Sequence, residues 1–251
     1  MNLTDAVKRR LTPRQWIALR RVVNGFRAVG RGGDLDHLAR IHGTDKFGLH
    51  SYTPHYAAHF RALRFKPVRL LEIGIGGYDD PYVGGGSLRM WKRYFPFGRI
   101  FGIDIHDKSP LDERRIRTFQ GSQDDPDFLR RVVGETSELD IVVDDGSHIS
   151  AHVIASFTAL FPCLKDGGVY VVEDTQTSYW PDFGGDRHDR PEAATSMNFF
   201  KRLADGLNHS EFAVPGYEPT YFDLNVRSMH FYHNMVFVYK GANPSTRRPG
   251  D

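Results

Sequence analysis

Short β-rich runs alternate with helix-like segments through most of this chain, and that alternation constrains its fold more than any other feature. The runs are VRLLEIGI (68–75), RIFGIDI (99–105), LDIVVDD (139–145) and GVYVVED (168–174). Helix starts are expected near Ser87, Asp125 and Ser150, and Gly167 and Gly168 are expected to close the last of these helices. The pattern favours an α/β fold, with a parallel sheet covered by helices on both faces.

The two ends of the chain depart from this alternation. Apolar residues at helical spacing predict helices over 4–29 and 35–41. The run MHFYHNMVFVYK (229–240) predicts an antiparallel hairpin with its turn at His233 and Asn234. The expected organisation is an N-terminal helical annex or lid (1–66), a main domain (67–241) and a disordered tail (242–251).

Composition excludes several classes of protein. No apolar run approaches the ~20 residues of a membrane-spanning helix, and the charged first residues lack a secretory signal. A single cysteine, Cys163, allows no intrachain disulfide, so a reducing, cytoplasmic location is expected. With a formal net charge of +2, nothing in the charge balance calls for nucleic acid.

A glycine-rich turn follows the first predicted strand. Gly74, Gly76 and Gly77 allow the backbone to approach a ligand closely, as in nucleotide-binding turns. A dinucleotide fingerprint needs a third glycine at position 79, where this chain has Asp79. The turn therefore disfavours an NAD-dependent oxidoreductase, which is one of the competing hypotheses.

An acidic residue before the turn and another at the end of the second strand match the arrangement of class I S-adenosylmethionine (SAM) methyltransferases. In that arrangement Asp104 accepts hydrogen bonds from the ribose hydroxyls, and Glu72 faces the methionine end. Ser87, at a helix N-terminus, suits the methionine carboxylate. Ser122 and Gln123, after the third strand, are candidates to contact the adenine edge.

Carboxylates gather at the predicted ends of two further strands. Asp145 ends one strand, and Glu173 and Asp174 end the next, after a single crossover helix. Neighbouring parallel strands would bring the three carboxylates together, and a hard divalent cation such as Mg²⁺ relieves their repulsion. His148 is then placed as a general base. Asp144 points to the other side of its strand and is expected to support the cofactor or the loop, not the metal.

Simpler explanations exist for each of these residues alone. An aspartate at a strand end is often a turn former, and an isolated histidine is often a surface or core residue. A second metal arrangement, with His148 and His152 four residues apart on a helix, also stays open. The joint occurrence of these side chains at strand ends, where open α/β sheets bind ligands, favours the functional interpretation.

Taken together, the motifs resemble the metal-dependent sugar O-methyltransferases typified by macrocin and mycinamicin O-methyltransferases. The resemblance is carried by HGTDKFGLHSYTPHYAAHF (42–60), LLEIGIGGY, GIDI, GSQDD, VVDDGSH, VVEDTQTSYWPDFGG and RSMHFYHNMVFVYKG. It implies a class I, Rossmann-like, mostly parallel seven-stranded sheet ending in the antiparallel hairpin. It also implies metal ligands at Asp145, Glu173 and Asp174, the base at His148, and a SAM site that includes Tyr78.

The resemblance implies a SAM- and Mg²⁺-dependent O-methyltransferase that acts on a sugar hydroxyl. For a chain this short, the expected acceptor is the 1-OH of a methylated mannoside in polysaccharide biosynthesis, and the alternative is a rhamnosyl or macrolide sugar. A catechol-type methyltransferase and a silent SAM-binding module compete with it. The expected acceptor contacts are His50, Tyr52, Tyr56, Tyr179 and Trp180. A homo-oligomer is expected.

Overall fold

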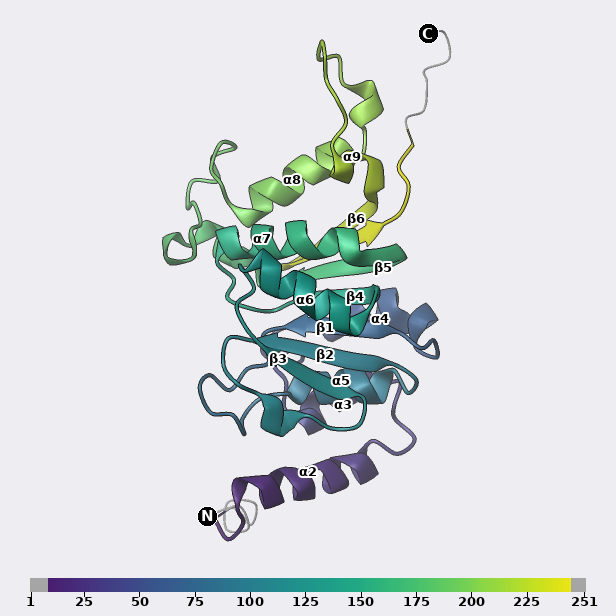
Figure 1. Ribbon diagram of the computed structural model, residues 1–251, viewed down its shortest axis with the longest axis vertical. Helices are drawn as coiled ribbons and strands as arrows, with labels where there is room; N and C mark the ends of the chain where they lie inside the picture. Colours follow the sequence, from purple (N-terminus) through teal and green to yellow (C-terminus); the bar gives the residue numbers. More distant parts are fainter. Residues whose placement is uncertain (1–8, 245–251) are drawn as a thin grey trace. The chain divides into compact units, whose positions relative to one another are not determined.

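The computed structural model describes residues 9–244, apart from the side chain of Arg21. Within these residues seven strands form one sheet in the order β3-β2-β1-β4-β5-β7-β6 (Figure 1). The predicted mostly parallel sheet with a C-terminal antiparallel hairpin is confirmed. Residues 4–8 of the first predicted helix and 245–251 of the predicted tail lie outside the described residues. No described helix is both long and apolar enough to cross a bilayer.

Two compact units make up the chain: residues 1–68 with 75–121, and residues 69–74 with 122–251. The predicted boundaries after residues 66 and 241 stay predictions.

The first unit contains four helices and two strands among its described residues. They are α2 (Pro13–Arg27), α3 (Leu35–His42), α4 (Thr53–Phe60), α5 (Gly86–Tyr94), β2 (Arg99–Asp104) and β3 (Ile116–Gln120), with short 3₁₀ turns η1 (Arg61–Leu63) and η2 (Ser109–Leu111). Strands β2 and β3 pair in parallel, and α3 lies beside α5 (Figure 1).

Local sequence signals explain where the N-terminal helices begin and end. Thr12 and Gln15 form a capping box at the start of α2, with Pro13 as its first residue. The Asp34 side chain caps α3, and Gly43 ends it in the left-handed conformation, with φ of 71°.

Helix α4 lies within residues 42–60, where helical spacing of apolar residues predicts no helix. Its buried side chains explain the difference. Tyr56 and Phe60 are fully buried one helical turn apart, and Tyr56 packs edge-on against Trp91 at a centroid distance of 4.8 Å. This aromatic packing within the first unit stabilises a short helix that sequence periodicity alone does not reveal.

The second unit holds the remaining strands. They are β1 (Arg69–Ile73), β4 (Leu139–Asp144), β5 (Leu164–Glu173), β6 (Val226–Tyr232) and β7 (Met235–Lys240). Strands β1, β4 and β5 run parallel, and β7 joins β5 in the antiparallel sense. Strand β6 then pairs with β7 through the predicted turn, where Asn234 has φ of 60°.

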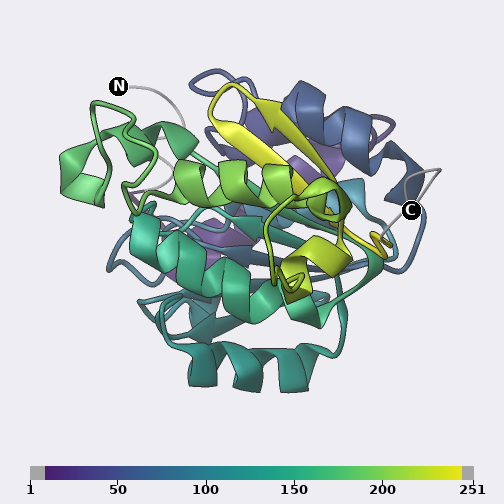
Figure 2. The same ribbon diagram turned by 90° about the horizontal axis from the view of Figure 1, so that it is seen from above.

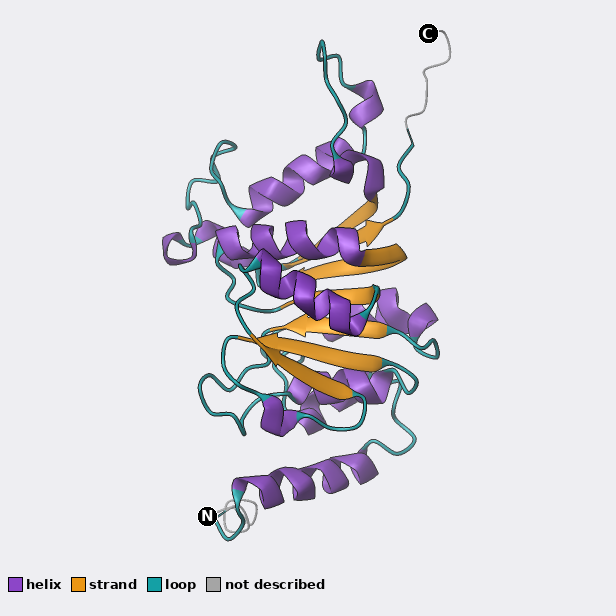
Figure 3. Ribbon diagram, in the orientation of Figure 1, coloured by secondary structure: helices purple, strands orange, loops and turns teal. Residues whose placement is uncertain are grey.

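Helices cover this part of the sheet (Figure 3). They are α6 (Pro126–Thr136), α7 (Ser150–Leu160), α8 (Ser196–Gly206) and α9 (Tyr221–Asn225), with 3₁₀ turns η3 (Phe161–Cys163), η4 (Thr175–Tyr179), η5 (Pro181–Phe183) and η6 (His209–Glu211). Helices α6 and α7 lie side by side (Figures 1 and 2). Phe157 of α7 joins α8 and α9 through ring contacts with Phe200 and Phe222.

The end of α7 differs from the expectation. The helix ends at Leu160, well before Gly167 and Gly168, which lie inside β5 instead. The register of β5 against β4 shifts in this region, between the pairs at Leu139 and Ile141, and Gly167 has φ of 80°. The two glycines therefore lie in the irregular first part of β5 and do not end helix α7.

The parallel pairing of β4 with β5 positions the predicted site. Asp144 lies opposite Val172, so both strands end at the same edge of the sheet. The residues that follow the two strands, Asp145 and Asp174, therefore emerge next to one another.

Candidate active site

Three side chains meet at the edge where β4 and β5 end. One ligand atom each from Asp145, His148 and Asp174 lies within 4.8 Å of the others. The His148 Nε2 atom is 3.6 Å from a carboxylate oxygen of Asp174. All three residues are half-buried, so the group is open to a small ligand yet partly shielded from water. Two carboxylates and an imidazole at this spacing fit a divalent cation that takes mainly oxygen ligands.

The backbone under this group is unusual. His148 and Asp174 both adopt the left-handed conformation, with φ of 57° and 53°, which non-glycine residues rarely do. The buried Thr177 hydroxyl lies 3.0 Å from the His148 carbonyl oxygen and 2.9 Å from that of Asp174, and donates to them. Such local strain concentrates at functional sites. Thr177 was not among the predicted site residues, although a threonine three residues after an aspartate is a recognisable turn pattern.

Gly74 explains how the turn after β4 fits beside β1. Its φ is 88°, and a Cβ atom there would lie 2.0 Å from the Asp145 carbonyl oxygen. The Asp145 amide in turn donates to the Ile73 carbonyl at 2.9 Å. Only glycine leaves room for this close approach, so the first glycine of the predicted turn also positions the loop that carries Asp145.

Asp144 belongs to a buried network and not to an open site. Its side chain is 1% exposed, and its carboxylate accepts hydrogen bonds from Gln123 Nε2 at 3.1 Å, Ser156 Oγ at 2.5 Å and the Tyr170 hydroxyl at 2.9 Å. Burial raises the pKa of the Asp144 carboxyl above its usual range, against the lowering effect of these hydrogen bonds. The network fixes the end of β4 against α7 and β5.

This network gives two predicted cofactor residues other partners. Gln123 is 6% exposed, and its carbonyl oxygen accepts from the Ser147 amide at 2.6 Å while its amide group donates to Asp144. Both halves of the Gln123 carboxamide are thus used inside the protein, where contact with adenine was expected. Asp144, expected to support the cofactor or the loop, is hydrogen-bonded within this network at the strand end. The Ser122 hydroxyl donates to Asp124.

Two other candidate ligands lie outside the three-residue group. Glu173 is the last residue of β5 and is 3% exposed. Among the described residues, the group of converging ligand atoms includes its neighbour Asp174 but not Glu173. His152, considered as a second histidine ligand, faces Ser147 at 3.0 Å and Asp124 at 3.4 Å.

The first unit carries the rest of the glycine turn. Asp104, at the end of β2, accepts hydrogen bonds from the Ile75 amide at 3.0 Å and the His106 amide at 2.9 Å. Each carboxylate oxygen keeps a second lone pair, so these bonds leave capacity for ribose hydroxyls. Ser87 lies in the first turn of α5, as expected for a residue near a helix N-terminus. Glu72 is fully buried on β1, in the second unit.

A buried lysine organises the loop after the turn. Lys108 is 1% exposed, and its ammonium donates to the carbonyl oxygens of Tyr78 at 2.6 Å, Asp80 at 2.8 Å and Val83 at 3.2 Å. The loop is also tight, because a Cβ atom on Gly77 would lie 2.2 Å from the Val83 carbonyl oxygen. The sequence does not indicate this role of Lys108, because no local motif connects the residue with a loop about thirty positions earlier.

The predicted acceptor contacts divide into buried and accessible residues. Tyr52 and Tyr56 are 3% and 0% exposed, so they belong to the core of the first unit, contrary to the expectation. His50 stacks on Tyr52 at 4.8 Å and is half-buried. Trp180 is 49% exposed, and Tyr179 beside it is half-buried. Of the predicted acceptor residues, Trp180 is thus the one with an accessible ring surface large enough for a sugar face.

Comparisons with known proteins agree with the fold. No family model matches the chain. It is 52% identical over 215 residues to mycinamicin VI 2''-O-methyltransferase of Micromonospora griseorubida, a match that covers 85% of this chain and 54% of that protein. It is 50% identical over 220 residues to 8-demethyl-8-alpha-L-rhamnosyl tetracenomycin-C 2'-O-methyltransferase of Streptomyces olivaceus, with 86% and 58% covered.

A solved structure matches as well. It is the methyltransferase of the mycinamycin pathway in complex with Mg, S-adenosylhomocysteine (SAH) and mycinamycin VI, with a TM-score of 0.82 and 52% identity. The match covers 86% of this chain and 56% of that protein, and it confirms the predicted class I methyltransferase fold. The chain spans about half the length of the curated relatives it matches. By sequence and by fold, the chain is a homologue of the macrocin- and mycinamicin-type sugar O-methyltransferases.

Proposed function

We propose that this protein transfers the methyl group of SAM to a sugar hydroxyl, in a reaction that depends on a divalent cation such as Mg²⁺. The observation that carries the proposal is the group of Asp145, His148 and Asp174 at the ends of two paired strands. Homology to sugar O-methyltransferases supports it.

The acceptor we propose is a hydroxyl of a deoxysugar, such as rhamnose, on a glycosylated natural product. The names of two relatives describe 2''-O-methylation of mycinamicin VI and 2'-O-methylation of a rhamnosyl tetracenomycin. These names favour the rhamnosyl or macrolide-sugar alternative over the methylated mannoside. The mannoside and its polysaccharide pathway receive no support from these relatives.

Asp145 and Asp174 would hold the cation, because their half-buried carboxylate oxygens converge. When bound, the cation would orient the acceptor hydroxyl and make it more acidic. His148 would accept the proton of that hydroxyl as general base, held in place by the strained turn and by Thr177. The expected role of Glu173 as a further ligand stays a prediction.

The glycine turn would hold SAM. Asp104 would accept hydrogen bonds from the ribose hydroxyls while it keeps its bonds to the turn backbone. Gly76, Gly77 and Ser87 would line the methionine side of the cofactor, as the sequence predicts.

The first test is mass-spectrometric detection of methyl transfer from SAM, with Mg²⁺ or with EDTA. The acceptor panel contains rhamnosyl and macrolide glycosides, mannosides and a catechol. We expect product with the rhamnosyl or macrolide glycosides, and only when Mg²⁺ is present. Product with catechol alone would move the protein to the small-phenol class, and product with mannosides alone would restore the first expectation.

Variants separate an enzyme from a silent SAM-binding module. His148→Ala is expected to lower kcat by about 10²- to 10⁴-fold, and Asp145→Asn to abolish the response to Mg²⁺, while both still bind SAH. Asp166→Asn, at an exposed carboxylate near the opposite end of β5, is the matched control and should keep full activity. Near-normal turnover in His148→Ala would refute the general-base role.

A further inference from the structure

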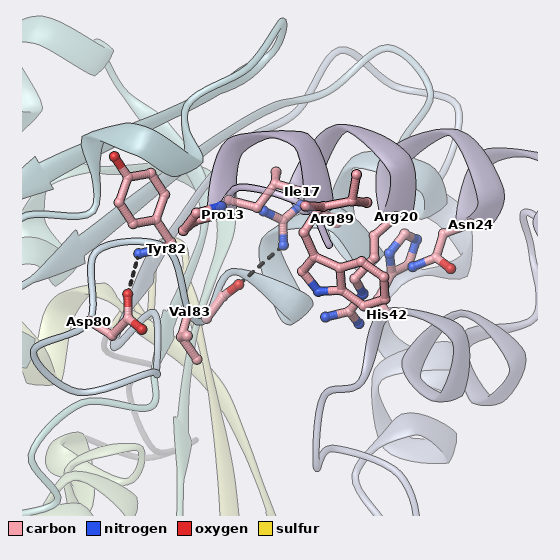
Figure 4. A pocket seen from close by; sticks show the side chains of 12 residues that line it. Pro13, Ile17, Arg20, Asn24, His42, Asp80, Tyr82, Val83 and Arg89 are labelled. Atoms are coloured by element: carbon pink, nitrogen blue, oxygen red, sulfur yellow. Dashed lines mark hydrogen bonds between the residues drawn. The ribbon is translucent and has the colours of Figure 1, made fainter. Parts of the chain in front are cut away.

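A cavity of about 320 Å³ lies within the first unit, apart from every residue assigned above to SAM, metal or acceptor. Helix α2 forms one wall, and the last residue of α3, the loop after the glycine turn and α5 form the others (Figure 4). Its lining residues include Trp16, Ile17, Arg20, Asn24, His42, Asp80, Val83 and Arg89. This volume is within the usual range for a pocket that holds a small organic molecule.

The first indication of a ligand is an unpartnered histidine. His42 lines the cavity, is only 6% exposed, and within the described residues neither of its ring nitrogens has a hydrogen-bond partner. Leaving a buried polar group unsatisfied costs about 1 to 3 kcal/mol, so such groups normally have partners. A neutral imidazole offers one donor and one acceptor, and a ligand in the cavity would satisfy them.

The second indication is charge. Burial, together with the smaller effects of Arg89, Arg93 and Arg20, lowers the pKa of His42 to about 3, so the imidazole is neutral in a positive environment. Arg20, Asn24 and His42 lie together at one end of the cavity (Figure 4). The acidic lining residue, Asp80, lies at the other end, where its carboxylate accepts from the Tyr82 amide at 2.8 Å.

Most of the remaining lining is apolar, apart from Arg89 and Tyr82. Leu11, Pro13, Trp16, Ile17 and Val83 supply hydrocarbon and aromatic surface next to the polar end. One end of the cavity is cationic and offers hydrogen bonds, and its body is apolar. It therefore fits a molecule with an anionic group at one end and an apolar body. An anion alone would leave the apolar surface uncovered, and an uncharged apolar molecule would leave His42 unsatisfied.

We propose that this cavity binds a small organic anion, with a carboxylate or phosphate group held by Arg20, Asn24 and His42 and an apolar or aromatic body against Trp16 and Ile17. The two anionic groups share one chemistry, because a guanidinium pairs with either. This proposal is independent of methyl transfer, so it stands or falls separately from the proposed function.

Calorimetric titration tests the proposal with benzoate and phenyl phosphate as probes. We expect at least one of them to bind the full chain with a Kd below about 1 mM, and the stronger of the two identifies the anionic group. Benzamide keeps the ring and removes the charge, whereas acetate and inorganic phosphate keep the charge and remove the ring. Each of these three should bind at least about tenfold more weakly. No binding of either probe at about 10 mM would overturn the proposal.

Variants locate the site. Arg20→Met should weaken the binding of the better probe by at least about tenfold, because it removes the cation next to His42. Arg27→Met, an exposed arginine in the last turn of the same helix, is the matched control and should bind like the original chain. Trp16→Phe should abolish the change in tryptophan fluorescence that accompanies binding. Equal weakening by Arg20→Met and Arg27→Met, or a fluorescence change that survives in Trp16→Phe, would place the probe elsewhere and overturn the proposal.

Discussion

Several single residues in this protein are partly or fully buried and also have an unusual backbone conformation or an unusual charge environment. His148 and Asp174 are held in the left-handed conformation where the proposed chemistry takes place, and Thr177 ties their carbonyl groups together. At His42 the unusual feature is electrostatic, because burial and nearby arginines keep its imidazole neutral. In both cases the surrounding fold stabilises a state that an isolated residue would avoid.

The lowered pKa of His42 predicts that the folded protein loses stability as the pH falls. Its pKa is lowered from 6.5 to about 3 in the folded protein, mainly by burial. The unfolded chain therefore binds more protons at this site between these two values, so stability is full above pH 6.5 and falls as the pH drops through this window. The site alone should remove about 2 kcal/mol of unfolding free energy between pH 7 and pH 5.

Urea unfolding at the two pH values measures this effect. In His42→Leu the loss of unfolding free energy on acidification should be smaller by about 2 kcal/mol than in the original chain. His106→Leu, at an exposed histidine, is the control and should show the original loss. An identical loss in His42→Leu and the original chain would show that His42 is not the acid-sensitive group.

At the scale of elements, the loop between the glycine turn and α5 is held by hydrogen bonds from a side chain that follows β2 in the sequence. Lys108 bonds three carbonyl groups of this loop, and Gly77 lets the two halves of the loop approach closely. Hydrogen bonds from a charged donor are stronger than neutral ones, and a buried ammonium needs such partners. The loop is therefore expected to be ordered before any ligand binds.

Lys108→Met tests this role, because methionine has a similar length but cannot donate hydrogen bonds. We expect amide hydrogen exchange to accelerate over residues 78–83, and SAH affinity to fall by at least about tenfold, or 1.4 kcal/mol. Lys66→Met, at an exposed lysine of the same unit, should change neither quantity. If exchange accelerates while SAH affinity is kept, the loop is organised by Lys108 but does not contribute to cofactor binding.

At the scale of the whole molecule, a ligand that binds only the native state must raise its stability. SAH at a hundredfold excess over its Kd should add about 2.7 kcal/mol to the unfolding free energy. For a chain of 251 residues this corresponds to a rise in Tm of roughly 5 °C or more in a thermal unfolding experiment. ATP serves as a control that shares the adenosine group, and an equal shift with ATP would argue against a SAM-specific site. The expected homo-oligomer stays a prediction that light scattering can measure.

The sequence by itself determined the arrangement of strands and the edge at which chemistry gathers. Apolar runs that alternate with helix starts predict the sheet, and polar side chains at the predicted strand ends place Asp145, His148 and Asp174 at one edge, because both signals are local in the sequence. The resemblance of several motifs then predicted the correct family.

Only the tertiary structure decided which polar side chains face a ligand and which are used inside the protein. Asp144 and Gln123 are tied into a buried network, and Tyr52 and Tyr56 are core residues, although the sequence marks all four as contact residues. The partners that decide these roles are distant in the chain: Asp144 and Tyr170, for example, are 26 positions apart. Burial and hydrogen bonding depend on such long-range neighbours, which no local pattern of residues specifies.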